Sequence, residues 1–162
     1  MNTITFHQQR RFAETAFGRI AYIEQGSGPA TLFLHGIPLC GYEWRDVIED
    51  LAPVRRCLAL DEMGLGYTEV AAGQDVSFAS QARMIAAFLD ATNIASVDLV
   101  GNDTGAGISQ IFAATYPAKV RSLTLTNCEV HDLWPNALLT GFYEGVASGV
   151  VPQLMKKMLS DL

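Results

Sequence analysis

Short apolar runs alternate along this chain with longer segments in which apolar residues recur every three or four positions. The runs at 31–34 (TLFL), 56–60 (RCLAL), 97–100 (VDLV) and 120–126 (VRSLTLT) predict strands, and the first two are apolar enough for burial on both faces. Segments 44–51, 77–91 and 105–116 predict helices; Ser77 can cap the second, and Pro117 ends the third. This alternation predicts an α/β fold, with a mainly parallel sheet and helices on both faces.

The two ends of the chain depart from this alternation. Near the start, residues 14–16 and 19–24 flank Phe17-Gly18, which predicts a hairpin. Residues 133–162 contain no clear strand and predict a helical or irregular region. We therefore divide the chain into a sheet-containing region, residues 1–128, and a helical region, residues 129–162.

The composition narrows the class of protein. Hydrophobic residues make up 49% of the 162 residues and charged residues 17%, which indicates a globular chain with a substantial core. The net charge of −6 argues against nucleic acid as a partner, because phosphate binding needs a basic surface. No stretch is apolar enough to span a membrane and no secretory signal is visible, so we expect a cytoplasmic protein with no membrane partner.

The cysteines and histidines do not form a recognisable metal-binding pattern. Cys40, Cys57 and Cys128 are scattered, without a C-x-x-C pair, and the three histidines are not spaced as metal ligands. We therefore expect reduced thiols, no metal and no cofactor.

The candidate chemistry begins at Gly101-Asn102-Asp103-Thr104-Gly105, which joins a predicted strand to a predicted helix. This is the layout of a nucleophile elbow, a tight turn whose flanking glycines leave room for one exposed reactive side chain. Here the side chain is a carboxylate instead of the more usual serine hydroxyl. The start of the following helix and the N–H of Thr104 favour negative charge at this point.

Two further motifs follow the strands at 31–34 and 56–60. They are His35-Gly36-Ile37-Pro38 and the D-x-x-G-x-G segment at 61–66. In this order and spacing, the three motifs resemble the α/β-hydrolase family, in the branch of haloalkane dehalogenases and epoxide hydrolases. The segment HGIPLCGYEWRDVIEDL is especially similar to the dehalogenase pattern, and the resemblance extends over about residues 10–135. It implies that residues 1–128 form the N-terminal part of the hydrolase core and that 129–162 begin its helical cap.

The resemblance also implies roles for individual residues. Asp103 takes the place of the nucleophile, and the backbone N–H groups of Ile37 and Thr104 take the place of the oxyanion donors. His35 and Gly36 belong to the oxyanion loop, where the histidine usually braces the backbone. The third motif is a scaffold loop. Some dehalogenases keep a charge-relay acid after the strand at 120–126, and Glu129 is close to that position.

An aspartate at the elbow favours a particular reaction. A carboxylate is already ionised at neutral pH, so it can displace a leaving group from a saturated carbon without a base. The product is an alkyl ester that water then hydrolyses. This chemistry predicts a hydrolase that cleaves a carbon–halogen bond or an epoxide C–O bond in a small apolar substrate.

The resemblance leaves the leaving group open. Dehalogenases of this kind hold the halide with side-chain N–H groups, commonly an Asn and a Trp, at the positions of Ile37 and Thr104, neither of which has such a group. Epoxide hydrolases instead use an acid, usually a cap tyrosine, to protonate the ring oxygen. Tyr143 lies in the cap-like region, although packing is its commoner role.

The family's histidine base comes after strands that this chain does not contain. His131 follows the last predicted strand, but a place at the rim of the site is the better expectation. Without later strands, the strand at 120–126 would present an open edge, so we expect the C-terminal helices, a second copy or a missing C-terminal fragment to cover it. Two alternatives remain: a truncated, non-catalytic binding module, and a serine esterase, which Ser109 inside the helix makes unattractive.

Overall fold

A computed structural model describes residues 1–128 and 137–160 of the chain. By their internal packing, the residues form two compact units, Met1–Cys128 and Glu129–Leu162. The first unit contains the whole sheet and the three motifs found in the sequence. It is therefore the part of the chain that carries the candidate site.

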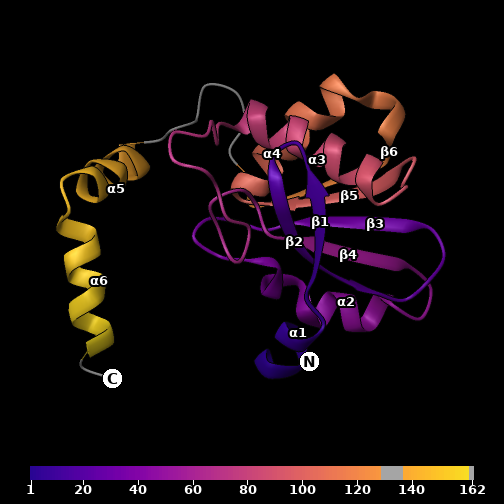
Figure 1. Cartoon of the computed structure of the whole chain (residues 1–162), viewed down its shortest axis with the longest axis horizontal. Coiled ribbons are helices and arrows are strands. Elements are labelled where there is room, and N and C mark those ends of the chain that lie inside the picture. The colour runs from indigo at the N-terminus through magenta and orange to yellow at the C-terminus, as the bar shows by residue number, and fades with distance from the viewer. Residues whose placement is uncertain (129–136, 161–162) are drawn as a thin grey trace. The chain divides into compact units, whose positions relative to one another are not determined.

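The first unit is built on a single six-stranded sheet (Figure 1). Its strands are β1 (Arg11–Thr15), β2 (Gly18–Gln25), β3 (Ala30–Leu34), β4 (Arg56–Leu60), β5 (Val97–Asn102) and β6 (Val120–Thr126). They lie in the order β1-β2-β4-β3-β5-β6. The strands from β3 to β6 are parallel to one another, while β1 and β2 pair antiparallel, as the predicted hairpin requires. The prediction of a mainly parallel sheet is confirmed.

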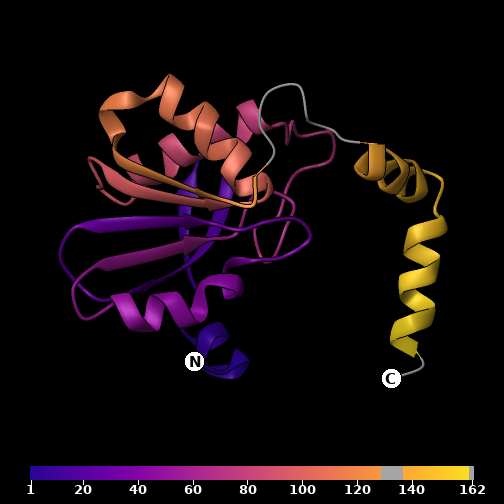
Figure 2. The ribbon, with the colours of Figure 1, turned by 180° about the vertical axis from the view of Figure 1, so that it is seen from behind.

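Helices cover both faces of the sheet. They are α1 (Thr3–Gln8), α2 (Arg45–Leu51), α3 (Phe78–Ala91) and α4 (Thr104–Thr115), with 3₁₀ turns at Gly41–Trp44 and Pro117–Lys119. Helices α3 and α4 lie on one face and α2 lies on the other, as the views from the two sides show (Figures 1 and 2). The chain between parallel strands must cross a face of the sheet, so each crossover helix buries its apolar side there.

The alternation of side chains along β3 divides the core into two layers. Leu32 and Leu34 belong to the larger layer, which contains the buried residues of α3 and α4. Phe33, between them, packs with Trp44 and Ile48 in the smaller layer beneath the 3₁₀ turn and α2. Because successive side chains of a strand point to opposite faces, the uninterrupted apolar run TLFL fits a strand with a core on both sides.

Local signals set the ends of the helices. The Ser77 side chain accepts a hydrogen bond from the backbone N–H of Ser80, so it caps α3 as predicted. Helix α4 ends at Thr115, two residues before Pro117, whose ring disfavours helical backbone at the preceding residue.

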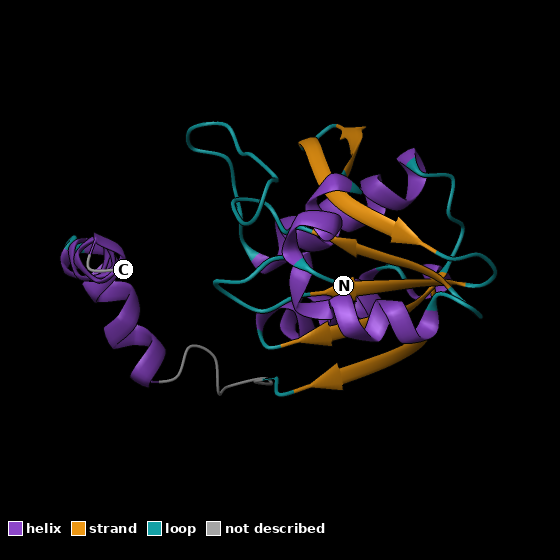
Figure 3. Ribbon diagram, turned by 90° about the horizontal axis from the view of Figure 1, so that it is seen from below, coloured by secondary structure: helices purple, strands orange, loops and turns teal. Residues whose placement is uncertain are grey.

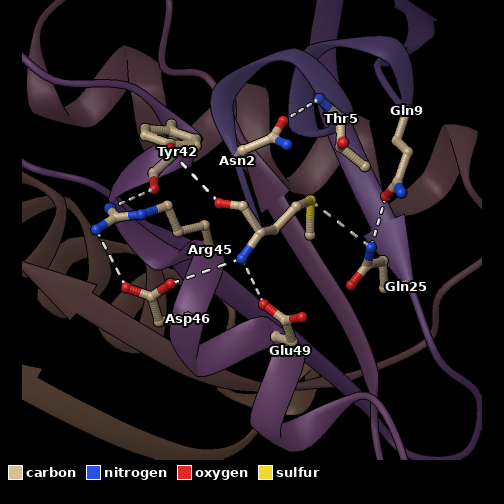
Figure 4. Close-up of polar contacts among 9 residues, drawn as sticks. Asn2, Thr5, Gln9, Gln25, Tyr42, Arg45, Asp46 and Glu49 are labelled. Atoms are coloured by element: carbon tan, nitrogen blue, oxygen red, sulfur yellow. Dashed lines mark hydrogen bonds and ion pairs between the residues drawn. The ribbon is translucent and has the colours of Figure 1, made fainter.

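The sequence pattern did not predict helix α1. Its six residues, TITFHQ, have one buried side chain, Phe6, which packs in the smaller core layer. Figure 4 shows polar contacts that hold this end of the chain, including the Asn2 side chain capping α1 at Thr5. The amino group of Met1 lies 2.5 Å from a carboxylate oxygen of Glu49 in α2. Tertiary contacts therefore stabilise a helix that is too short to be stable alone.

Strand β6 forms one edge of the sheet and pairs with β5. In Figure 3 it is seen as an outermost strand of the sheet. Most of its side chains are exposed within the first unit, and Leu123 is 39% exposed. The predicted cover over this edge stays a prediction.

Within its described residues, 137–160, the second unit contains two helices, α5 (Ala137–Ala147) and α6 (Val150–Ser160). Both agree with the helical character predicted for residues 133–162. None of the helices described is long and apolar enough to cross a membrane.

Candidate active site

Asp103 lies at the turn between β5 and α4, as the elbow motif predicts. Its backbone has φ 52° and ψ −123°, a conformation that costs a non-glycine residue about 1–3 kcal/mol. The surrounding structure must impose this turn, and it places the carboxylate at the N-terminus of α4. Strained backbone of this kind is typical of nucleophile elbows.

The glycines on either side of Asp103 are required by close contacts. A Cβ atom at Gly101 would lie 2.7 Å from the Cα of Ala106 in α4. A Cβ atom at Gly105 would lie 2.4 Å from the carbonyl oxygen of His35. Real Cβ atoms do not approach backbone atoms so closely, so these two glycines allow the helix to pack onto the ends of β5 and β3.

Two backbone N–H groups converge on one oxygen of Asp103. The N–H of Thr104 donates to Oδ1 at 2.6 Å, and that of Ile37 donates to the same atom at 3.3 Å. The loop carrying Ile37 is very close to Asp103, since a Cβ atom at Gly36 would lie 2.7 Å from the Asp103 Cβ. The structure thus brings together the two donors and the carboxylate that the sequence singled out from separate motifs.

His35 is fully buried beneath this loop, with both ring nitrogens engaged. Nε2 lies 3.1 Å from the backbone nitrogen of Glu62, and Nδ1 lies 3.0 Å from the carbonyl oxygen of Gly36. Because the backbone N–H can only donate, Nε2 is the acceptor and Nδ1 carries the proton. Burial lowers the pKa of His35, so the ring is neutral. His35 therefore braces the loop and has no nitrogen left to act as a base.

A carboxylate outside the predicted motifs ties the oxyanion loop to the elbow. Glu43 accepts the N–H of Gly36 at 3.0 Å with one oxygen and the side-chain N–H of Asn102 at 2.6 Å with the other. The Asn102 side-chain oxygen in turn accepts the hydroxyl of Thr126 at 2.9 Å. This chain of hydrogen bonds connects the ends of β3, β5 and β6. Because the N–H of Gly36 is used here, Gly36 shapes the loop and does not donate to Asp103.

Asp61, in the third motif, accepts hydrogen bonds from backbone N–H groups of nearby loops with both carboxylate oxygens. One carboxylate oxygen accepts the backbone N–H of Gly41 at 2.8 Å and the other accepts that of Tyr67 at 2.9 Å. Gly66 has φ 54°, and a Cβ atom there would lie 2.3 Å from Asp61. The D-x-x-G-x-G motif is thus a self-contained scaffold loop at the end of β4.

Glu62, the next residue, lacks such support. It is 3% exposed, and its Oε1 has no hydrogen-bond partner among the described residues. Burial, first, and then the charges of Asp103, Glu43 and Asp61 raise the pKa of Glu62 to about 8. Glu62 is therefore protonated at neutral pH. The sequence contains no clear signal for Glu62, because it is the second of two adjacent acidic residues that follow β4.

The remaining site predictions fall on parts of the chain without described side chains. Glu129, His131 and the side chain of Tyr143 lie outside the described residues. Their predicted roles stay predictions. Within the described part of the chain, no cluster of His, Cys, Asp or Glu could hold a metal ion.

A hollow of about 510 Å³ lies beside the oxyanion loop, lined by residues 38–40, Tyr42, Glu43, Arg45 and Gly66. Asp103 is not among the lining residues. The candidate site is therefore the elbow with the adjacent loop at residues 35–38, and not this hollow.

A strained elbow, an oxyanion loop and a mainly parallel sheet are the parts of an α/β-hydrolase. The family model described as "alpha/beta hydrolase fold" matches residues 29–156, and the chain belongs to this family. A haloalkane dehalogenase of Mesorhizobium japonicum is 40% identical over 108 residues, which are 64% of this chain and 34% of the relative.

Solved structures agree with this relationship. The structure of a putative ancestral haloalkane dehalogenase matches with a TM-score of 0.68 and 35% identity, over 73% of this chain and 42% of that one. An epoxide hydrolase from an endophytic Streptomyces matches with a TM-score of 0.68 and 30% identity, over 72% and 36% of the two chains. The predicted branch of the family is confirmed.

The chain is shorter than the proteins it matches. It spans 34% to 42% of the length of curated relatives that are haloalkane dehalogenases. The similarity therefore establishes the family and the fold of this segment, while the activity and substrate of the whole protein are proposals.

Proposed function

We propose that the chain carries the nucleophilic half of a hydrolase that opens a carbon–halogen or epoxide C–O bond through an ester on Asp103. The observation that carries the proposal is the pair of N–H groups, from Ile37 and Thr104, on one oxygen of Asp103. The names of the relatives, haloalkane dehalogenases and an epoxide hydrolase, support the same reaction class.

In the proposed reaction the two oxygens of Asp103 have different tasks. Both N–H groups donate to Oδ1, so Oδ2 is the oxygen available to attack carbon. In the first step Oδ2 bonds to a saturated carbon of the substrate and the leaving group departs with the bonding electrons. Oδ1 then becomes the carbonyl oxygen of the new ester, and it stays next to both donors.

The same two donors serve the second step. Water attacks the carbonyl carbon of the ester, and negative charge develops on Oδ1. The N–H groups of Ile37 and Thr104 are already aimed at that atom, so no rearrangement is needed to stabilise the charge. Each donor of this kind typically contributes about 10²–10³ to the rate.

Activation of that water needs a base. His35 cannot be the base, because its two nitrogens are engaged within the loop. We expect the ester to form faster than it is hydrolysed in this 162-residue chain, so that the adduct accumulates. Rapid multiple turnover would contradict this expectation.

The test is to incubate the chain with a small alkyl iodide or epoxide and to locate the adduct by peptide mass spectrometry. We expect one alkyl group on the peptide that contains Asp103. Asp103→Asn should abolish it, while Asp50→Asn, a change at an exposed aspartate of α2, should leave it unchanged. An adduct spread over several exposed carboxylates, or retained in Asp103→Asn, would refute the proposal.

A non-catalytic binding module is the second candidate. It is favoured by the side chains at positions 37 and 104, an isoleucine and a threonine, which offer no N–H group to a halide. Such a module would bind these small molecules reversibly, as seen by calorimetry, without any covalent adduct on Asp103. The mass-spectrometry experiment therefore separates the two candidates.

A further inference from the structure

Glu62 is a buried carboxyl group that the proposed reaction of Asp103 does not use. Its Oε1 has no hydrogen-bond partner in the described residues, although both oxygens of its neighbour Asp61 accept backbone N–H groups. Leaving a buried polar atom unpaired typically costs about 1–3 kcal/mol of stability. A scaffold role would not explain this cost, because the loop around Asp61 is complete without the Glu62 carboxyl.

The fold places Glu62 beside the nucleophile. Glu62 follows β4 and Asp103 follows β5, with β3 between these two parallel strands. Adjacent strands are about 4.8 Å apart, so the two strand ends are about 10 Å apart along the same edge of the sheet. The backbone N–H of Glu62 donates to His35, whose neighbour Gly36 packs against Asp103. A single loop therefore separates the two groups.

Among the described residues, the charges that raise the pKa of Glu62 all belong to carboxylates. Asp103 has the strongest effect, ahead of Glu43 and of the adjacent Asp61, while His35 is neutral. With burial, these charges keep a proton on Glu62 at neutral pH, as its pKa of about 8 indicates. The site thus holds a protonated carboxyl group at Glu62 close to the carboxyl group of Asp103.

We propose that Glu62 is the acid that protonates the oxygen leaving carbon when Asp103 attacks, which makes an epoxide the class of electrophile suited to this site. The proposal rests on the proposed role of Asp103. It assigns a proton donor within the first unit of the chain, at a residue outside the elbow and the oxyanion loop.

The bonds and protons of the first step balance. The Asp103 carboxylate forms a C–O bond to one epoxide carbon, and the C–O bond of the ring breaks. The ring oxygen takes the electron pair of the broken bond and the proton of Glu62. The products are a hydroxyalkyl ester on Asp103 and a carboxylate on Glu62.

An alkyl halide makes no such use of Glu62. Halide leaves as a weakly basic anion that needs no proton, and the side chains at positions 37 and 104 offer it no N–H group. The same nucleophile can therefore be tested with two electrophiles of similar size, of which only the epoxide needs the acid.

The experiment measures the rate of adduct formation on Asp103 in the full 162-residue chain, with epoxybutane and iodobutane as probes. Glu62→Gln keeps the shape of the side chain without a transferable proton, and Glu69→Gln is a matched change at an exposed glutamate in the neighbouring loop. General acids typically contribute about 10²–10⁴ to a rate, so we expect Glu62→Gln to slow the epoxide reaction at least about tenfold. The iodide reaction should change less than about threefold, and Glu69→Gln should match the unaltered chain with both probes.

The pH dependence of the unaltered chain gives a second readout that needs no variant. The epoxide reaction should slow by about tenfold per pH unit above about pH 8, where Glu62 loses its proton, while the iodide reaction should not. Equal slowing of both probes in Glu62→Gln, no slowing of either, or identical pH profiles would overturn the proposal and leave Asp103 as the nucleophile. No adduct with either probe in the unaltered chain would refute the nucleophile itself, and the role of Glu62 with it.

Discussion

The hydrogen bond between Glu43 and Asn102 predicts a pair of substitutions that should be harmful alone and harmless together. Glu43 accepts from Asn102 at 2.6 Å and from the N–H of Gly36 at 3.0 Å. Asn102 also accepts the hydroxyl of Thr126. Exchanging the acid and the amide, by Glu43→Gln with Asn102→Asp, reverses the direction of the bond between these two side chains and keeps every partner satisfied.

Each single change has a cost that the geometry fixes. Asn102→Asp places a second carboxylate against Glu43, and two unit charges about 4 Å apart repel by about 4 kcal/mol near a protein surface. Glu43→Gln replaces charge-assisted bonds with neutral ones and sets two amide groups against each other, at a cost of about 1–2 kcal/mol. If the effects were independent, the double variant would lose about 5–6 kcal/mol of unfolding free energy.

We expect the double variant instead to lie within about 1 kcal/mol of the unaltered chain, because the new amide at position 43 can donate to the new carboxylate at position 102. Urea denaturation of the four proteins, followed by circular dichroism, measures this coupling. Acid should partly rescue Asn102→Asp, since a proton on either carboxyl removes the repulsion. Additive losses in the double variant would refute the hydrogen bond on which the reasoning depends.

The remaining predictions concern the buried acid, an elbow glycine and the sheet edge. The folded chain keeps the Glu62 proton up to about pH 8, while the unfolded chain loses it near pH 4.5. The free energy of unfolding should therefore fall by about 1.4 kcal/mol per pH unit between these two values. Urea denaturation at several pH values in this range should show the decline, and Glu62→Gln should flatten it. Gly105→Ala should lower the free energy of unfolding by more than about 3 kcal/mol, because its Cβ would lie 2.4 Å from the His35 carbonyl oxygen. Gly141→Ala, in open space within α5, should raise it by about 0.5–1 kcal/mol. Thermal melts compare the two variants directly, and similar effects would contradict the close contact at Gly105. We expect association through β6 in light scattering, reduced by Leu123→Lys, and a monomer at high concentration would count against a second copy as the cover.

The sequence predicted those elements whose causes are local. The apolar runs that became β3 and β4 are buried on both faces, and the cap at Ser77 begins α3 where the side chain meets a free backbone N–H. Helix α1 has no apolar periodicity and depends on Phe6 reaching a core built from distant strands. Packing across the fold decides such a helix, so no local pattern could reveal it.

The candidate site likewise contains residues that local motifs predict and residues that only the folded chain identifies. The elbow and the oxyanion loop are short motifs whose glycines and spacing indicate tight turns. Asp103, Ile37 and Thr104 could therefore be grouped from their motifs alone. The role of Glu43 depends on partners that lie far along the chain, since Asn102 is separated from it by 59 positions. In the sequence Glu62 resembles a surface carboxylate, and it differs only in its burial, which is a property of the folded chain.

The distribution of N–H donors explains why one carboxyl of this site behaves unlike its neighbours. Asp61, Glu43 and Asp103 each accept two hydrogen bonds, most of them from backbone N–H groups. The buried Oε1 of Glu62 has none from the described residues, so a proton is what remains to neutralise this carboxyl. Carboxyl groups of nearly identical chemistry therefore differ in their hydrogen-bond partners, and Glu62 is the one with a buried oxygen that accepts no hydrogen bond from the described residues. The fold therefore determines, in the absence of substrate, which carboxyl group carries a proton that it can donate.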